Sequence, residues 1–240
     1  MKILVLGDIH GMGCWEPIIE KENPDLTIFL GDYVSSHGLV TEKQQIDNLK
    51  RILEYKEENP DNVILLRGNH DLASLYYWAE CYPMNGERVD EYIRNNKERF
   101  LNNTQWIYLY KNICFSHAGV SSIWMENNKI KSLEDINTLE PSELFAFTGK
   151  MSDFTGISPQ QPPTWIRPST LVYCGYKGVI HVVGHTNVGP LRNYKDEYIK
   201  SGMYSQVELD KFVDVWCCDT LPREYLIIDN DKFIVKKYGT

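Results

Sequence analysis

Residues 2–11 read KILVLGDIHG, and this stretch decides the fold. Residues 2–6 are an apolar run rich in β-branched side chains, the kind that forms a strand buried on both faces of a sheet. Gly7 ends the run, and Asp8 and His10 follow it. The stretch therefore predicts a buried strand that presents a carboxylate and an imidazole at its carboxyl end.

Four more apolar runs end in the same way, in Gly or Ser followed by Asp, Asn or His. They predict strands at 26–30, 62–66, 112–116 and 179–183. The polar residues that follow these runs are Asp32, Asn69, His70, Asp71, His117 and His185.

Amphipathic helices are predicted between the strands, most clearly at about 41–58 and 87–101. Two further runs, at 225–229 and 233–237, predict a terminal hairpin. Strands that alternate with helices are typical of an α/β sandwich.

One domain, residues 1–240, is the simplest organisation of the chain. It has 240 residues, of which 42% are hydrophobic, and it shows no internal repeat or flexible linker. The polar stretch at about 121–170 is interpreted as a surface excursion that forms a lid or specificity region. A net charge of −8 argues against nonspecific nucleic-acid binding through a basic surface.

The cysteines and the N-terminus bear on the compartment. The six cysteines show no CxxC pair, which favours a reducing cytosol over a disulfide scaffold. The apolar run before Gly7 is too short for a signal peptide, and no run approaches the roughly 20 apolar residues of a membrane span. We therefore expect a cytoplasmic protein without membrane partners.

The polar residues at the strand ends are expected to converge, because ligands of open α/β sheets bind outside the carboxyl ends of the strands. Imidazole and carboxylate groups suit first-row divalent metals. Asp8 and His10, two residues apart on an extended chain, are expected to face one ion. The two oxygens of Asp32 can bridge two cations about 3.5–4 Å apart.

Each of these residues alone is more readily explained as a helix cap or a turn residue. His181, inside its strand, is assigned to packing. Capping does not require His10, His117 or His185, however, and five such endings together favour a metal site.

The motifs GDIHG, GDYV, LLRGNHD, SHAG and VVGHT, between residues 7 and 186, resemble in this order those of calcineurin-like metallophosphoesterases. They look most like the phosphoprotein phosphatase branch, which includes bacterial and phage phosphatases and symmetrical dinucleoside tetraphosphatases. The resemblance implies a two-sheet β-sandwich flanked by helices, with the metal site at the carboxyl ends of the strands. It also implies two divalent metal ions, Mn²⁺ or Mn²⁺ with Fe, Zn or Ni in place of one.

The resemblance assigns a role to each matching residue. It implies that Asp8 and His10 bind the first metal and that Asp32 bridges the two metals. It implies second-metal ligands at Asn69, His117 and His185, with Asn69 also near the phosphate. His70 would protonate the leaving group, and Arg167, in WIRP, would bind phosphate. The alternative for Arg167 is an ordinary surface arginine beside Pro168.

Two segments depart from the family pattern. Asn187 stands where more distant branches have a second histidine, which favours the phosphatase-like branch. GDYVSSHG has Ser35 and Ser36 where the family motif GDxVDRG has Asp and Arg, and it adds one residue before Gly38. We expect His37 to substitute partly as a phosphate-binding group, with weaker monoester activity; the alternative is a turn residue that faces water.

The expected activity is metal-dependent phosphoester hydrolysis by a hydroxide activated between two metals. A phosphomonoesterase similar to protein Ser/Thr phosphatases is expected first, acting on a phosphoprotein or a small phosphorylated molecule. Dinucleoside polyphosphate hydrolysis and nucleotide or RNA phosphoesterase activity are the enzymatic alternatives. A weakly active module that binds a phosphorylated ligand and a structural protein are the non-enzymatic ones. Selectivity is expected in 72–110 and 121–170.

Overall fold

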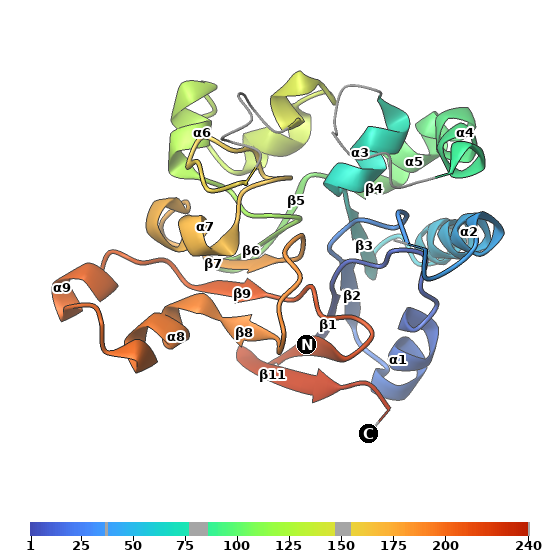
Figure 1. Ribbon diagram of the computed structural model, residues 1–240. Coiled ribbons are helices and arrows are strands. Elements are labelled where there is room, and N and C mark those ends of the chain that lie inside the picture. The colour runs from blue at the N-terminus through green and yellow to red at the C-terminus, as the bar shows by residue number, and fades with distance from the viewer. Residues whose placement is uncertain (37, 77–85, 147–154, 240) are drawn as a thin grey trace.

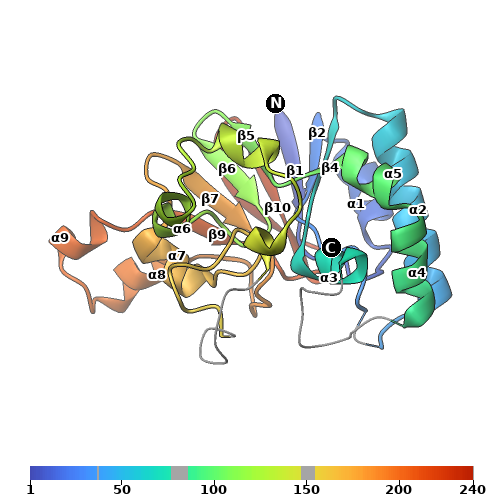
Figure 2. The ribbon, with the colours of Figure 1, turned by 90° about the horizontal axis from the view of Figure 1, so that it is seen from above.

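Two β-sheets packed face to face form the centre of the molecule (Figure 1). The computed structural model describes residues 1–36, 38–76, 86–146 and 155–239. Helices cover the outer face of each sheet, so the layers run helix, sheet, sheet, helix when seen from above (Figure 2). The predicted α/β sandwich of two sheets flanked by helices is confirmed.

The first sheet has six strands in the order β11-β10-β1-β2-β3-β4. Its strands are β1 (Lys2–Leu6), β2 (Leu26–Phe29), β3 (Val63–Leu66), β4 (Thr104–Gln105), β10 (Glu224–Asp229) and β11 (Lys232–Lys237). β1 to β4 run parallel, so their carboxyl ends share one edge. β10 and β11 form the predicted terminal hairpin, turning at Asn230 and Asp231, both with positive φ.

The second sheet has five strands in the order β5-β6-β7-β9-β8. Its strands are β5 (Ile107–Tyr110), β6 (Ile113–Ser116), β7 (Ile180–Val183), β8 (Arg192–Asn193) and β9 (Val215–Cys217). β6, β7 and β9 run parallel. β6 and β7 match the predicted runs, whereas β5, β8 and β9 are additional to the prediction.

The helices fall into two groups, one on each sheet (Figure 1). Beside the first sheet are α1 (Trp15–Glu22), α2 (Glu42–Glu58), α3 (Asn69–Leu75), α4 (Glu87–Asn95) and α5 (Lys97–Asn103). Beside the second are α6 (Ser122–Asn127), α7 (Pro168–Cys174), α8 (Tyr194–Ser201) and α9 (Gln206–Leu209), with the 3₁₀ helices η1 (Glu134–Thr138) and η2 (Glu143–Phe145). Among the described residues, no helix is both long and apolar enough to cross a membrane.

Two helices were predicted with different success. α2 begins after Thr41, whose side chain forms a capping box with Gln44, and it ends close to the predicted boundary. The prediction of a single helix at 87–101 is wrong, because the structure has two helices there, α4 and α5, separated at Asn96. The Asn96 backbone leaves the helical region, with φ −112° and ψ 22°, and its side-chain amide donates to the Tyr92 carbonyl. Asparagine competes in this way for backbone groups and favours helix ends.

The core lies between the sheets and under the helices. Ile3 and Val5 of β1 face the second sheet, where they join the same buried cluster as Phe115. Leu4 and Leu6 face α1 and α2. β1 is therefore buried on both faces, as its continuous apolar run predicts.

The stretch 121–170 packs against the second sheet over much of its described length. Trp124, Ile136 and Phe145 are buried there, and the Phe145 ring stacks on Trp106 with centroids 3.5 Å apart. Residues 147–154 lie outside the described residues. The role of the stretch as a lid or specificity region stays a prediction.

His181 lies inside β7, fully buried, and its Nε2 donates to the Tyr176 carbonyl 3.0 Å away. Burial lowers the pKa of this imidazole to about 4, whereas an unfolded histidine titrates near 6.5. Between these values the unfolded chain binds a proton that the folded chain does not. Stability should therefore fall as the pH drops from about 6.5 to about 4, by about 3 kcal/mol from this residue.

A His181→Met variant tests this expectation. It removes the titrating group and should flatten the acid limb of the unfolding free energy, although the lost hydrogen bond lowers stability at every pH. Urea unfolding of chelator-treated protein at pH 7 and pH 4.5 measures the difference. An equal pH dependence in both proteins would show that His181 does not titrate as expected.

Candidate metal centre

Candidate ligands from both sheets meet at the carboxyl ends of the parallel strands. The side chains that the structure brings together are Asp8, His10, Asp32, Asn69, His117 and His185. Ligand atoms of Asp8, His10 and Asp32 lie within 4.8 Å of one another, and so do those of Asp32, His117 and His185. Asp32 belongs to both groups.

Strained backbone positions several of these side chains. His10, Asp32 and His185 have φ of 45°, 50° and 62°, in the left-handed region that residues other than glycine rarely adopt. The expectation that His10 reaches the site by extended spacing is therefore wrong. A left-handed turn brings His10 Nε2 to 3.9 Å from Asp8 Oδ2.

The glycines of the motifs make room for carboxylates from a neighbouring strand. A Cβ at Gly68 would come within 2.1 Å of Asp32 Oδ1, and one at Gly184 within 2.2 Å of Asp8 Oδ1. Any side chain at either position would displace a candidate ligand. This close approach explains why glycine precedes the polar residues at these strand ends.

His117 and His185 are held in defined tautomers. The Nδ1 of His117 donates to the Leu30 carbonyl at 2.8 Å, and the Nε2 of His185 donates to the Trp165 carbonyl at 3.1 Å. Burial lowers the pKa of His117 to about 3 and that of His185 well below its usual value, so both rings are neutral. The other nitrogen of each ring therefore carries a lone pair.

These two lone pairs point at a side-chain oxygen, an arrangement that suits a bound cation. His117 Nε2 and His185 Nδ1 each lie 2.8 Å from Asn69 Oδ1, and His117 Nε2 is 3.5 Å from Asp32 Oδ2. Acceptors this close repel one another unless a positive charge lies among them. Neutral imidazole, amide and carboxylate groups are also ligands that first-row divalent metals prefer. The residues present therefore fit a divalent metal ion.

Asp8 is a buried carboxylate beside a second acid that the sequence analysis missed. The His185 N–H donates to Asp8 Oδ1 at 2.8 Å. Burial, and then the charge of Asp219, raise the pKa of Asp8 well above its usual value. Burial also raises the pKa of Asp219 to about 6. Asp219 comes two residues after the end of β9, a strand of three residues. It is thus another polar residue that follows a strand, and recognising β9 in the sequence would have made it a candidate site residue.

Asp71 is another residue whose role was not predicted. Its carboxylate accepts backbone N–H groups of Asp32, Tyr33 and Gly68, each at 2.9 Å. Asp71 therefore ties the loop after β2 to the start of α3. Its signal in the sequence is the acid directly after GNH.

His70 lies beside Asp32 and His10. Its Nε2 is 4.0 Å from Asp32 Oδ2, and its ring meets that of His10 edge-on at 5.6 Å. Its backbone N–H donates to Asp32 Oδ1 at 2.9 Å. The side chain of His70 is 16% exposed, whereas that of Asp32 is 2% exposed.

Arg167 also reaches the site. Its guanidinium Nη1 donates to Thr186 Oγ1 at 3.2 Å and lies 3.5 Å from the His185 carbonyl oxygen. Its Nε donates to the Thr155 carbonyl at 3.2 Å. The arginine is thus beside a candidate ligand, although it comes from the loop before α7.

The segment after Asp32 departs in sequence from the family motif GDxVDRG. Ser35 and Ser36 are buried, and both backbone N–H groups donate to Gln45 Oε1. The Ser36 hydroxyl donates to the Val40 carbonyl, so it is occupied within the loop. His37, the predicted phosphate-binding substitute, lies outside the described residues.

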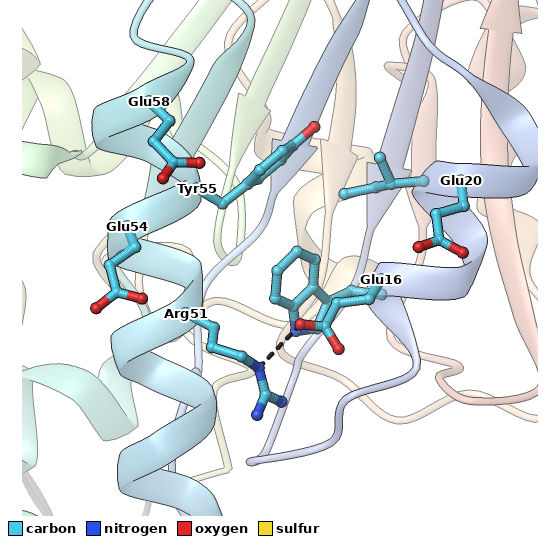
Figure 3. Close-up of a pocket in the computed structure, with 8 residues that line it drawn as sticks. Glu16, Glu20, Arg51, Glu54, Tyr55 and Glu58 are labelled. Carbon is cyan, nitrogen blue, oxygen red and sulfur yellow. Dashed lines mark ion pairs between the residues drawn. The ribbon is translucent and has the colours of Figure 1, made fainter.

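A cavity of about 520 Å³ lies elsewhere, between α1 and α2 (Figure 3). Trp15 and Tyr55 line it, and the ion pair of Arg51 with Glu16, 2.9 Å long, joins the two helices there. Within the described part of the chain, its lining residues include no candidate ligand. The cavity is therefore separate from the candidate metal centre.

Comparison with known families decides the classification. The sequence profile described as calcineurin-like phosphoesterase matches residues 1–218. The chain belongs to this family. A calcineurin-like phosphoesterase is a hydrolase that acts on phosphoester bonds and uses divalent metals, which agrees with the clustered Asp and His side chains.

Curated relatives of this phosphoesterase are distant in sequence. It is 24% identical over 229 residues to the serine/threonine-protein phosphatase 4 catalytic subunit of Kluyveromyces lactis, covering 89% of this chain and 68% of that protein. The corresponding Saccharomyces cerevisiae subunit is 24% identical over 172 residues, covering 68% of this chain and 51% of that protein. The chain thus spans 51% to 68% of the length of these relatives.

Solved structures support the fold. A cold-active protein-tyrosine phosphatase of a psychrophilic Shewanella species superimposes with a TM-score of 0.65 and 18% identity, covering 99% of this chain and 78% of that one. A metallophosphoesterase from Sphaerobacter thermophilus gives 0.52 and 14% identity, covering 100% and 89%. At such identities these likenesses show the calcineurin-like fold alone.

Proposed function

We propose that this phosphoesterase hydrolyses phosphomonoesters, as protein Ser/Thr phosphatases do, with two divalent metal ions bound at the carboxyl ends of the strands. The proposal rests on one observation above all. Two groups of ligand atoms, one around His10 and one around His117 and His185, share the carboxylate of Asp32. Bound divalent ions lower the pKa of a bound water and neutralise phosphate oxygens.

Six residues would hold the two ions. Asp8, His10 and Asp32 would bind the first, and Asp32, Asn69, His117 and His185 the second, with Mn²⁺ as the expected ion. The Asn69 oxygen would serve as a neutral ligand and would also lie near the phosphate.

The other residues of the site would act on the substrate. Arg167 would hold a phosphate oxygen by charge-assisted hydrogen bonds. His70, whose side chain is partly exposed, would give a proton to the departing oxygen. Arg167 Nη1 lies 3.5 Å from the His185 carbonyl oxygen and His70 Nε2 lies 4.0 Å from Asp32 Oδ2, so each side chain is beside a candidate ligand.

The substrate class is proposed from the relatives. The curated relatives named above are Ser/Thr phosphatase catalytic subunits, so a phosphomonoester of a protein or small molecule is the first candidate.

A reducing, cytoplasmic location is proposed from the cysteines. Those that the structure describes are free thiols, and Cys114, Cys217 and Cys218 are buried.

A substrate panel tests the proposal. Protein stripped of metal should be inactive, and Mn²⁺ should restore turnover of p-nitrophenyl phosphate more than that of bis(p-nitrophenyl) phosphate. Phosphopeptides and dinucleoside tetraphosphates complete the panel. Preferred cleavage of the tetraphosphate would replace the monoesterase proposal with a dinucleoside polyphosphate hydrolase. Absence of metal-stimulated turnover with every substrate would leave a phospholigand-binding module.

The Arg167→Ala variant should raise KM and lower kcat for phosphomonoesters without changing metal content. The guanidinium is next to the site but is not a candidate ligand, so its loss should leave the metal ligands in place. Each charge-assisted hydrogen bond contributes about 1.5–3 kcal/mol, which corresponds to a loss in kcat/KM of about 10–100-fold. Steady-state kinetics and elemental analysis measure both quantities, and an unchanged kcat/KM would exclude phosphate binding by Arg167.

A further inference from the structure

One peptide unit, between Val34 and Ser35, links the candidate ligand His10 to α2. Its carbonyl group accepts a hydrogen bond from His10 Nδ1 at 3.0 Å. Its N–H group donates to Gln45 Oε1 at 2.9 Å. We propose that Gln45 is a positioning residue for the candidate metal centre, which fixes the tautomer and ring orientation of His10 through this peptide.

The tautomer of His10 follows from the group that its Nδ1 meets. A carbonyl oxygen can only accept, so Nδ1 carries the proton and Nε2 has the lone pair. Nε2 is the atom that lies 3.9 Å from Asp8 Oδ2. Imidazole ligands commonly depend on such a partner for the ring nitrogen that faces away from the metal.

Gln45 is itself held on several sides. It is 4% exposed, its Oε1 also accepts the Ser36 N–H at 3.3 Å, and its Nε2 donates to Ser36 Oγ at 3.0 Å. A Cβ added at Gly11 would lie 2.7 Å from Gln45 Cγ, so the methylene groups pack against the turn that follows His10. Gln45 is thus wedged between the loops that follow β1 and β2.

The peptide needs an acceptor on the side of α2. Ser35 has a φ of 68°, in the left-handed region that is unfavourable for serine. Rotation of the Val34–Ser35 peptide would relieve this conformation, but it would turn the carbonyl away from His10. The hydrogen bond to Gln45 opposes this rotation, and hydrogen bonds in such a chain polarise one another.

The test compares two substitutions of similar length. Gln45→Met removes the acceptor, whereas Gln45→Glu keeps it. Ser36→Ala is the matched control, because it removes the hydroxyl contact of Gln45 but leaves the Ser35 N–H in place. ¹⁵N NMR of the histidine ring nitrogens in metal-free protein reports the tautomer of His10. We expect the Nδ1–H form in the wild type, Gln45→Glu and Ser36→Ala, and a mixture of tautomers in Gln45→Met.

Metal binding gives a second readout, and this part rests on the proposed function. Calorimetric titration with Mn²⁺ should show one of two sites weakened about 10–100-fold in Gln45→Met, the loss typical of partners that orient metal ligands. The Gln45→Glu variant should not show this loss. If Gln45→Met does not fold, Gln45→Asn replaces it, since its amide is one methylene too short to reach Ser35.

The outcomes separate the two proposals. An Nε2–H tautomer of His10 in the wild type, or an unchanged tautomer with unchanged Mn²⁺ affinity in folded Gln45→Met, would overturn the role of Gln45 and leave the proposed function intact. Absence of Mn²⁺ binding by the wild type would instead contradict the proposed function. The tautomer, read without metal, would still decide the role of Gln45.

Discussion

The Asp32→Asn variant is expected to lose nearly all activity and most of its bound metal while it keeps its fold. Asp32 is shared by both groups of ligand atoms, so its carboxylate would contribute charge to both of the proposed ions. Removal of a group that only orients a metal ligand typically lowers metal affinity or activity about 10–100-fold. Loss of the shared ligand itself should therefore lower kcat/KM by more than about 100-fold. Elemental analysis and p-nitrophenyl phosphate turnover measure the two effects.

The fold should survive because asparagine has the shape of aspartate. Its amide oxygen can still accept the His70 N–H, which now bonds to Asp32 Oδ1 at 2.9 Å. Its amide nitrogen can donate to the lone pair of His117 Nε2, 3.5 Å from Asp32 Oδ2. Asp47→Asn removes the same charge from an exposed carboxylate of α2, which pairs with Lys43, and should change neither metal content nor rate. Two bound metals with wild-type turnover in Asp32→Asn would exclude the bridging role.

The His70→Asn variant is expected to behave differently, with both metals retained and kcat for alkyl phosphates lowered by about 10²–10⁴-fold. His70 borders the site without belonging to either group of ligand atoms, and its backbone bond to Asp32 does not depend on its side chain. Its loss should therefore remove the proposed proton donor and leave the candidate ligands in place. Metal content and kcat, measured on the same preparation, test both parts.

The leaving group provides an internal control for His70. An alkoxide needs a proton as it departs, whereas p-nitrophenolate does not. The loss in His70→Asn should therefore be largest for alkyl phosphates and much smaller for p-nitrophenyl phosphate. Equal losses for the two substrates would exclude the role of His70 as the acid.

The strand ends were predictable because they depend on local pattern and on one rule of topology. Continuous apolar runs identify buried parallel strands, and the carboxyl ends of such strands meet at one edge. Asp8, Asp32 and Asn69 follow strands of the first sheet, and His117 and His185 follow strands of the second. The pattern alone predicts each group, but the juxtaposition of the two sheets came from the resemblance.

Other features depend on contacts between segments that no local pattern encodes. β9 has three residues, too few for a clear apolar run, so Asp219 behind it went unnoticed. Gln45 looks like an ordinary polar residue on an amphipathic helix, and its burial follows only from the loop after Asp32. The left-handed turn at His10 likewise depends on pairing with that loop, since the His10 N–H donates to the Asp32 carbonyl at 2.8 Å.

Anomalous diffraction from crystals grown with Mn²⁺ tests the two-metal proposal most directly. Two ions should lie about 3.5–4 Å apart, on either side of the Asp32 carboxylate. His10 Nε2 should contact the first ion, and His117 Nε2 and His185 Nδ1 the second. A single ion, or a pair of ions that Asp32 does not bridge, would contradict the proposed dinuclear centre.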